Sequence, residues 1–373
     1  MSLSANGPEA RETLMLSLEE AFERDDNEKA LTLSNELISL FPDDTECLCM
    51  HAAALSMADE LDEALEFCGK ALDTHPDALD LIQTAVELLL QLSEESPEAL
   101  EEAADRLEHG CEVGEERLAQ LSAASDGSEA ALEAIEALKE GLSALYLLAT
   151  DAFRLLDEPH RSLAAAQRAQ ALFPEDPDLR ACLASALFEL CRFDEARAEL
   201  EAVLRETPDN AWAMFNYAIL LDHLGRSEEA DALILKAHAL DPEVCPAQQK
   251  MSAKSFEKVV ERAMKALPDK VRDYLGNVAI IVEALPAAEE LLQSEPPLSP
   301  NCLGMFRGTP GPQQSVSDPW STFPSAIVLF QRNLERSARD RDELVTEIGI
   351  TLLHEVGHFL GLDEDDVAAL GLA

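Results

Sequence analysis

Small and apolar residues recur along the first two thirds of the chain at intervals that fit pairs of helices. Prolines mark the repeat, because Pro42 and Pro76 are 34 residues apart and so are successive members of the series Pro174, Pro208 and Pro242. Twelve positions before each proline stands a small residue: Ala30, Ala64, Ser162, Ala196 and Ala230. Small residues let two antiparallel helices approach closely, and the proline ends the second helix. The pattern predicts an array of helix pairs.

This period resembles that of the tetratricopeptide repeat. The resemblance covers about residues 10–246 and is strongest in residues 210–243, which include Trp212 and Gly225. It implies a TPR-like α-solenoid whose concave face binds a protein partner or an extended peptide. Residues 1–9 are expected to be a flexible N-terminus. Residues 78–160 depart from the period, so we expect elongated or irregular helices there, with an exposed loop at 122–128.

The hydrophobic pattern changes after Pro246. Helices are predicted at 252–267, 286–293, 333–338 and about 342–360, and apolar runs predict buried strands at 277–283 and 325–330. The residues 294–322 are rich in Pro, Ser and Gly, and the hexapeptide 303–308 within them is compatible with a strand and turn. The expected fold class is mainly α, with the solenoid followed by a small α+β domain over residues 252–373.

The last long helix carries the motif H-E-x-x-H at His354, Glu355 and His358, followed by x-x-G-x-x-E. Positions four apart share one helix face, so both imidazoles can reach one metal ion. Zinc suits two imidazoles and one oxygen ligand, with a further position open to water. Glu355 is placed to take a proton from that water, as in enzymes that hydrolyse amide bonds.

The third zinc ligand is expected to be a carboxylate beyond Gly361, a residue that permits a sharp turn. Glu364 lies three residues after this glycine, at the position of the third ligand in longer motifs of this type. We favour Glu364, with Asp365 second and Asp363 third. The alternative is that the motif arose by chance in a Glu-rich chain and that residues 363–366 only cap a short final helix.

Charge narrows the range of partners. The chain has 28 Lys and Arg against 74 Asp and Glu, a net charge of −46, and most of the excess lies before residue 251. Such a surface repels phosphate backbones and anionic lipid, so we expect no nucleic acid and no membrane as partners. Basic segments of a protein or peptide substrate are favoured instead.

The eight cysteines form no C-x-x-C pair, which is consistent with a reducing compartment. There is no apolar leader and no run of eighteen apolar residues. A cytoplasmic location is therefore predicted.

Four segments precede the motif in order: 256–268, 277–283, 303–310 and 327–332. Together with the motif helix they resemble the zincin-like metallopeptidases of bacteria, often called minimal zincins, over about residues 252–372. The resemblance implies a zinc metallopeptidase, a hydrolase expected to act as an endopeptidase, with Zn²⁺ as its cofactor. That family more often has Asp at the last motif position, where this chain has Glu364.

Substrate contacts are predicted less specifically. Ile327, Val328 and Leu329 are expected to form the strand beside the cleft, which would hold an extended peptide by strand addition. Tyr274 and Arg307 are candidates for oxyanion stabilisation, with a structural role as the alternative. Two other functions stay open: a repeat scaffold with an inactive or structural zinc site, and a metal-dependent hydrolase of non-peptide substrates.

Overall fold

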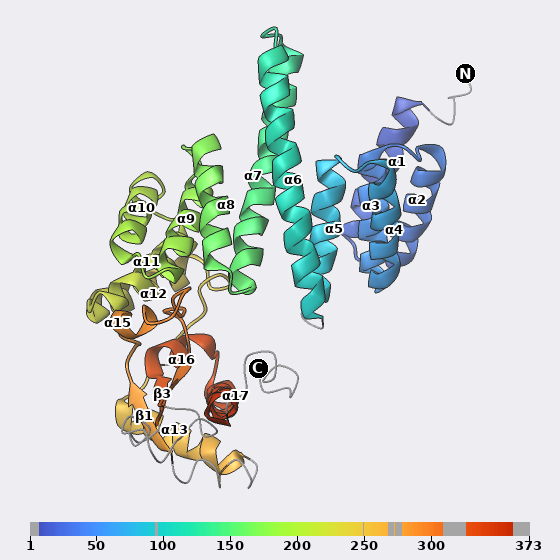
Figure 1. Cartoon of the computed structure of the whole chain (residues 1–373). Helices are drawn as coiled ribbons and strands as arrows, with labels where there is room; N and C mark the ends of the chain where they lie inside the picture. The colour runs from blue at the N-terminus through green and yellow to red at the C-terminus, as the bar shows by residue number, and fades with distance from the viewer. Residues whose placement is uncertain are drawn as a thin grey trace. The chain divides into compact units, whose positions relative to one another are not determined.

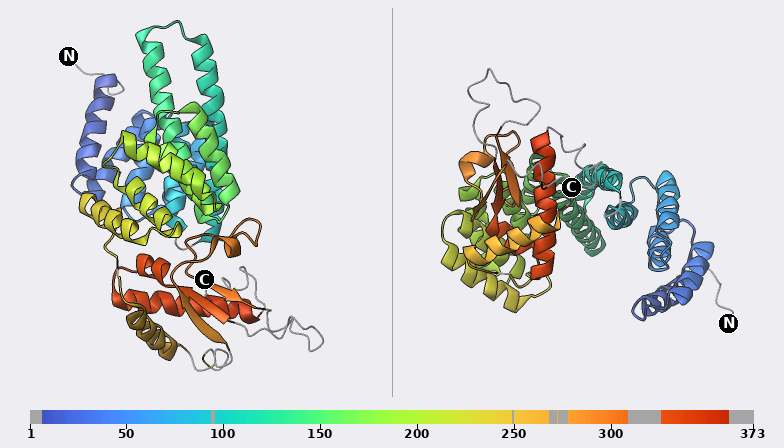
Figure 2. Two further views of the ribbon diagram at one scale, coloured as in Figure 1. Left: turned by 90° about the vertical axis from the view of Figure 1, so that its left-hand side faces the viewer. Right: turned by 90° about the horizontal axis from the view of Figure 1, so that it is seen from below.

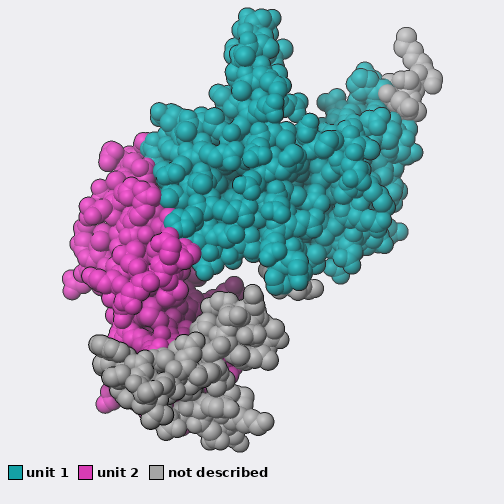
Figure 3. Space-filling view, viewed as in Figure 1, with its two compact units in different colours: residues 1–186 teal, residues 187–373 magenta. Residues whose placement is uncertain are grey.

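The structure is a computed structural model that describes residues 7–93, 96–248, 250–267, 272, 278–308 and 326–360, with side chains up to residue 357. It divides into two compact units, residues 1–186 and 187–373 (Figure 3). Among these described residues, no helix is long and apolar enough to span a bilayer.

The first unit is an array of helices in which sequence neighbours pack against each other (Figure 1). Its elements are α1 (Pro8–Phe22), α2 (Asn27–Leu40), α3 (Thr45–Met57), α4 (Leu61–Thr74), α5 (Leu79–Leu92), α6 (Pro97–Ala124), α7 (Glu129–Leu155) and α8 (Pro159–Leu172), followed by most of α9 (Pro177–Glu189). The small residues of the 34-residue period lie at the helix contacts, since Ala30, Ala64 and Ser162 are all buried. The small side chains at these positions therefore allow the helices to pack closely.

The 34-residue period is also visible in the backbone of the turns. The turn between the two helices of a pair contains one residue in the left-handed conformation, at Asp25, Asp59, Asp157, Cys191 and Gly225. The amide of the following residue donates to a carbonyl near the end of the first helix, as Asp26 does to Ala21 and Arg226 to Leu221. This is the Schellman arrangement, which ends a helix by satisfying its last carbonyls. A Schellman motif thus ends the first helix of each of these pairs.

Residues 78–160, expected to be elongated or irregular, contain two long helices. α6 has 28 residues and α7 has 27, and they pack along each other around Leu107, Leu142 and Tyr146. The connecting loop is shorter than the predicted 122–128, because α6 continues to Ala124. Ser128 caps α7 by accepting a hydrogen bond from the Ala131 amide.

The second unit continues with helices and then adds a small sheet. Its elements are the end of α9, then α10 (Phe193–Glu206), α11 (Ala211–His223), α12 (Ser227–Leu240), α13 (Ala253–Ala266), β1 (Ala279–Glu283), α15 (Ala288–Leu291), β2 (Gly304–Arg307), β3 (Ala326–Phe330), α16 (Gln331–Ser337) and α17 (Arg341–Leu360). The predicted fold class, mainly α with a small α+β part at the end, is confirmed.

The three strands lie in the order β1-β3-β2. β1 is parallel to β3, with Ile280 opposite Ile327, and β2 is antiparallel to β3, with Phe306 opposite the same residue. Helices α13 and α17 pack together and cover one face of this sheet (Figure 2). The core between them contains Phe256 from α13 together with Ile348 and Leu352 from α17. This packing fixes the position of the motif helix.

Candidate functional site

The motif lies on α17, a continuous helix of 20 residues. Asp340 begins the helix by accepting hydrogen bonds from the amides of Asp342 and Glu343, at 2.8 and 2.9 Å. One stripe of the helix is buried in the sheet core: Leu344, Ile348, Leu352 and Val356. Because this stripe is anchored along its length, the remaining faces of the helix hold a fixed orientation.

Glu355, the predicted general base, is buried on α17, with 5% of its surface exposed. It lies against the first residue of β2, since a β-carbon built on Gly304 would be 3.4 Å from Oε1 of Glu355 and 2.6 Å from Cγ2 of Thr351. The strand approaches the helix this closely because residue 304 has no side chain. Sequence reasoning missed Gly304 and Thr351. The available signals were the glycine at position 304 of the hexapeptide 303–308 and the helical spacing that places Thr351 on the face of the two histidines.

Cys302 lies close enough to Glu355 for the two groups to interact electrostatically. Burial raises the pKa of its thiol to about 12, and the negative charge of Glu355 adds to the effect. In the absence of a metal ion the thiol is therefore protonated at neutral pH.

The predicted metal ligands are described only in part. His354 is half-buried on α17, and position 358 follows one helical turn later, so the two positions share a face. The side chain of His358 and all of residues 363–366, including Glu364, Asp365 and Asp363, lie outside the described residues. Within the described part, no group of three or more His, Cys, Asp or Glu residues is arranged to hold a metal. Two imidazole positions beside a buried carboxylate are nevertheless a donor set that fits zinc.

The strand prediction needs a correction. Ile327, Val328 and Leu329 belong to β3, which is fully buried and pairs with β1 on one side and β2 on the other. Both backbone edges of β3 are occupied, so it cannot accept a peptide by strand addition. The strand beside Glu355 is β2, which pairs only with β3 among the described residues.

Arg307, an oxyanion candidate, lies on β2 but on the opposite face from Gly304 and Phe306, because side chains alternate along a strand. Its guanidinium forms ion pairs with Glu283 at 2.6 Å and Glu290 at 2.5 Å, which raise its pKa. These contacts agree with a structural role for Arg307, which is the alternative to oxyanion stabilisation. The other candidate, Tyr274, lies outside the described residues.

Comparison with known families decides how the two parts are classified. Residues 275–372 match the sequence model of a family described as zincin-like metallopeptidase. Residues 156–209 and 192–254 match that of the tetratricopeptide repeat. The chain combines tetratricopeptide repeats with a zincin-like metallopeptidase domain. In this zincin-like domain, α17 carries the motif and β2 is the strand beside it.

No curated protein matches the chain. Solved structures that resemble it include YrrB, a TPR protein with an unusual peptide-binding site, at 22% identity over 56% of this chain and 92% of that one, with a TM-score of 0.38. A thermophilic TPR protein of Thermus thermophilus is 21% identical over 57% and 98%, with a TM-score of 0.38. PilF of Pseudomonas aeruginosa is 16% identical over 67% and 97%, with a TM-score of 0.45. Such values carry no argument about function.

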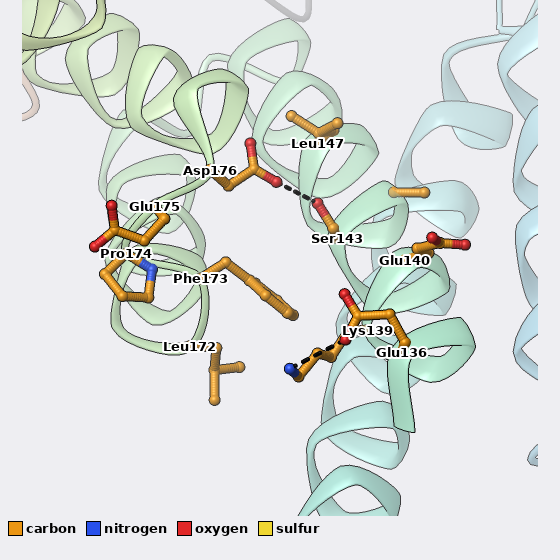
Figure 4. Close-up of a pocket in the computed structure, with 11 residues that line it drawn as sticks. Glu136, Lys139, Glu140, Ser143, Leu147, Leu172, Phe173, Pro174, Glu175 and Asp176 are labelled. Carbon is orange, nitrogen blue, oxygen red and sulfur yellow. Dashed lines mark hydrogen bonds and ion pairs between the residues drawn. The ribbon is translucent and has the colours of Figure 1, made fainter. Parts of the chain in front are cut away.

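The repeats of the first unit contain a second candidate site. A hollow of about 520 Å³ lies between α7 and the turn from α8 to α9 (Figure 4). Its apolar wall includes Phe173, and its charged groups are the carboxylates of Glu136, Glu140, Glu175 and Asp176 with Lys139 as the one cation. Lys139 pairs with Glu136 at 3.3 Å, and Ser143 donates to Asp176 at 3.0 Å. The remaining charge of the hollow is negative, which suits a basic side chain of a partner.

Proposed function

We propose that the protein is a zinc-dependent endopeptidase whose tetratricopeptide repeats recruit a protein substrate or a regulator. The observation that carries the proposal is the placement of Glu355, a buried carboxylate of the H-E-x-x-H helix that lies against the first residue of β2. The match of residues 275–372 to the zincin-like metallopeptidases supports the same chemistry.

The zinc would be held by His354 and His358, with Glu364 as the favoured third ligand and Asp365 or Asp363 as alternatives. When bound, zinc would supply a Lewis acid and favour ionisation of a nearby water. Glu355 would accept the proton of the attacking water at its carboxylate and then donate it to the leaving amine. Its burial between α17 and β2 restricts its rotamers, so the carboxylate needs little reorganisation.

The substrate would bind as an extended peptide along β2. A peptide there would use main-chain hydrogen bonds of Gly304–Arg307, with side-chain pockets adding specificity. The acidic repeats, including the hollow beside α7, would favour substrates or regulators with basic segments. The alternative function is a repeat scaffold that carries an inactive or structural zinc site.

Two measurements on purified protein test the proposal. Elemental analysis should find about one zinc per chain, lost in His354→Ala and reduced in Glu364→Ala. Cleavage of a peptide library should be lost in Glu355→Gln, by a factor of about 10²–10⁴. The matched control is Glu347→Gln, which changes a carboxylate on the same helix outside the motif.

The outcomes separate the two functions. A protein that binds no zinc after zinc is added would contradict the enzyme. A protein that binds zinc, and whose Glu355→Gln variant keeps every cellular activity of the wild type, would favour the scaffold.

A further inference from the structure

Asp222 of the last repeat lies in a buried ion-pair cluster with the zincin-like domain. Its side chain, at the end of α11, is fully buried and accepts hydrogen bonds from Arg332 and Arg336 of α16. Ser227 donates to its other oxygen at 2.6 Å. Arg332 also pairs with Asp231 of α12 at 2.8 Å. Both carboxylates belong to the repeats and both cations to the zincin-like domain.

The contacts continue from α16 toward β2. Arg336 donates to Oδ1 of Asn333 at 3.1 Å. Asn333 is itself buried, and its amide nitrogen donates to the carbonyl oxygens of Pro300 and Cys302, both at 2.8 Å. These carbonyls belong to residues 299–303, the segment that leads directly into β2. The orientation of the Asn333 side chain therefore fixes the backbone of the 299–303 segment.

A second repeat residue holds the same segment. Glu189, the last residue of α9, accepts hydrogen bonds from Ser299 at 2.6 Å and from Asn301 at 3.0 Å. The segment then meets β3, where the Phe330 amide donates to the Leu303 carbonyl at 2.9 Å. Five consecutive residues are thus tied to the repeats at one end and to the central strand at the other.

The next residue is Gly304, whose position against Glu355 and Thr351 leaves no space for a β-carbon. A small shift of the 299–303 segment would move β2 relative to the carboxylate. Displacements of about 1 Å in a positioned group are enough to change catalytic rates about a hundredfold.

We propose that Asp222 and Glu189 of the repeats are positioning residues for the peptidase site. Asp222 acts through Arg336 and Asn333, Glu189 acts directly on the 299–303 segment, and together they set the place of β2 beside Glu355. The last repeats are therefore part of the catalytic unit as well as a recruitment module. This inference rests on the proposed function, because it assigns β2 as the strand that binds the peptide.

The test uses full-length protein and variants that break single links. Asn333→Ala removes the donor to the Pro300 and Cys302 carbonyls, and Glu189→Gln replaces one of its acceptor oxygens with a donor. Arg336→Lys keeps the charge beside Asp222 but lacks the fork needed to reach Asn333 at the same time. Asn216→Ala is the matched control, since among the described residues the Asn216 side chain donates to the Trp212 carbonyl on the exposed side of α11.

The first readout is hydrogen–deuterium exchange of the peptide that contains residues 303–307, which requires neither zinc nor activity. We expect exchange there to rise about tenfold in Asn333→Ala, Arg336→Lys and Glu189→Gln, while α13 and the control variant stay unchanged. The second readout is peptide cleavage, in which kcat should fall about tenfold with a smaller change in KM and unchanged zinc content.

The results distinguish this inference from the proposed function. Unchanged exchange at residues 303–307 in all three variants would overturn the positioning role even if the protein cleaves peptides. An equal rise of exchange throughout the second unit would also overturn it, because it would show a purely structural role. If exchange rises at β2 but the wild type cleaves no peptide, the peptidase proposal fails. The contacts from the repeats to β2 would then have no role in catalysis.

Discussion

Gly304 and Thr351 are packed so closely that a β-carbon on residue 304 would lie 2.6 Å from Cγ2 of Thr351. The same β-carbon would be 3.1 Å from the carbonyl oxygen of Val328 in the central strand. The glycine therefore packs against a side chain of the motif helix on one side and against the backbone of β3 on the other. Neither β2 nor the motif helix can move without disturbing the other.

Gly304→Ala is expected to push β2 away from α17. Overpacking of this kind costs about 1–3 kcal/mol in the free energy of unfolding. Peptide cleavage should fall about tenfold or more, because β2 and Glu355 separate. Urea unfolding of the second unit and kcat/KM on one peptide substrate measure the two effects.

The same pair of helix and strand supplies the controls. Gly349 lies on α17 with open space around it, so Gly349→Ala should stabilise the protein by up to about 1 kcal/mol and leave cleavage unchanged. Adding Thr351→Ser to Gly304→Ala removes Cγ2 but keeps the hydrogen bond of the hydroxyl to the Glu347 carbonyl, and should restore part of the activity. Equal behaviour of the two alanine variants would contradict the packing argument.

His223 should make the second unit sensitive to mild acid. It is buried beside the rings of Phe188 and Phe193, and its Nε2 has no hydrogen-bond partner in the described structure. Burial, together with the positive charge of Arg336, lowers its pKa to about 4. The unfolded chain binds this proton near pH 6.5, so stability is complete above that pH and falls as pH drops toward 4. The expected loss is about 3 kcal/mol over this range.

Urea unfolding at pH 7 and pH 5 measures this dependence. His223→Phe removes the titrating group and keeps an aromatic ring in the same place, so its stability should change much less between the two pH values. The idea is wrong if the wild type and His223→Phe lose the same free energy.

The helix pairs could be predicted from the sequence because their determinants are local. A small residue such as Ala30 or Ala196 indicates a close contact between two helices. The proline twelve residues later indicates the end of the second helix. The register of α6 and α7 could not be predicted in this way, because apolar periodicity continues through both long helices and only the loop before Ser128 interrupts it.

Only the part of the site that lies on a single helix could be predicted from the sequence. The motif helix was recognised from His354, Glu355 and His358, whereas the strand beside it was assigned wrongly. The apolar run at 326–330 indicates burial on both faces, which is typical of a central strand. The edge strand β2 is short and begins with a glycine, so its pattern is weak. Links such as Asn333 to Cys302 depend on chain segments that meet only in the fold, and the third zinc ligand stays a prediction.

Two glycines of the long helices should respond to alanine in opposite directions. A β-carbon on Gly114 of α6 would lie 2.7 Å from Cδ1 of Leu142 and 3.4 Å from Cδ1 of Leu79, whereas one on Gly141 of α7 would meet nothing within 4 Å. Gly141→Ala should therefore raise the free energy of unfolding by about 1 kcal/mol through helix propensity. Gly114→Ala should lower it by about 1 kcal/mol, because overpacking exceeds that gain. Thermal unfolding followed by circular dichroism compares them, and two stabilising changes would show that α6 and α7 pack less closely.

Arg11 should control the titration of Asp44 in the first unit. Its guanidinium donates to both carboxylate oxygens, at 2.7 and 3.0 Å, and so joins α1 to the residue that caps α3. These hydrogen bonds lower the pKa of Asp44 to about 2. The stabilisation is therefore complete above about pH 4, the ordinary range of an Asp side chain, and is lost as pH falls through about 2.

Arg11→Ala should move the Asp44 midpoint, read from its side-chain carbon by NMR, toward about 3.9. It should also destabilise the first unit at pH 7 by about 1 kcal/mol, since the partly exposed pair is screened by solvent. Lys70→Ala is the control: its pair with Glu66 has both side chains well exposed, so its loss should leave α1 and Asp44 unaffected. A wild-type midpoint near 3.9 would mean that the Arg11 pair does not form in solution, and α1 would then be held by apolar contacts such as those of Met15, Leu18 and Ala21.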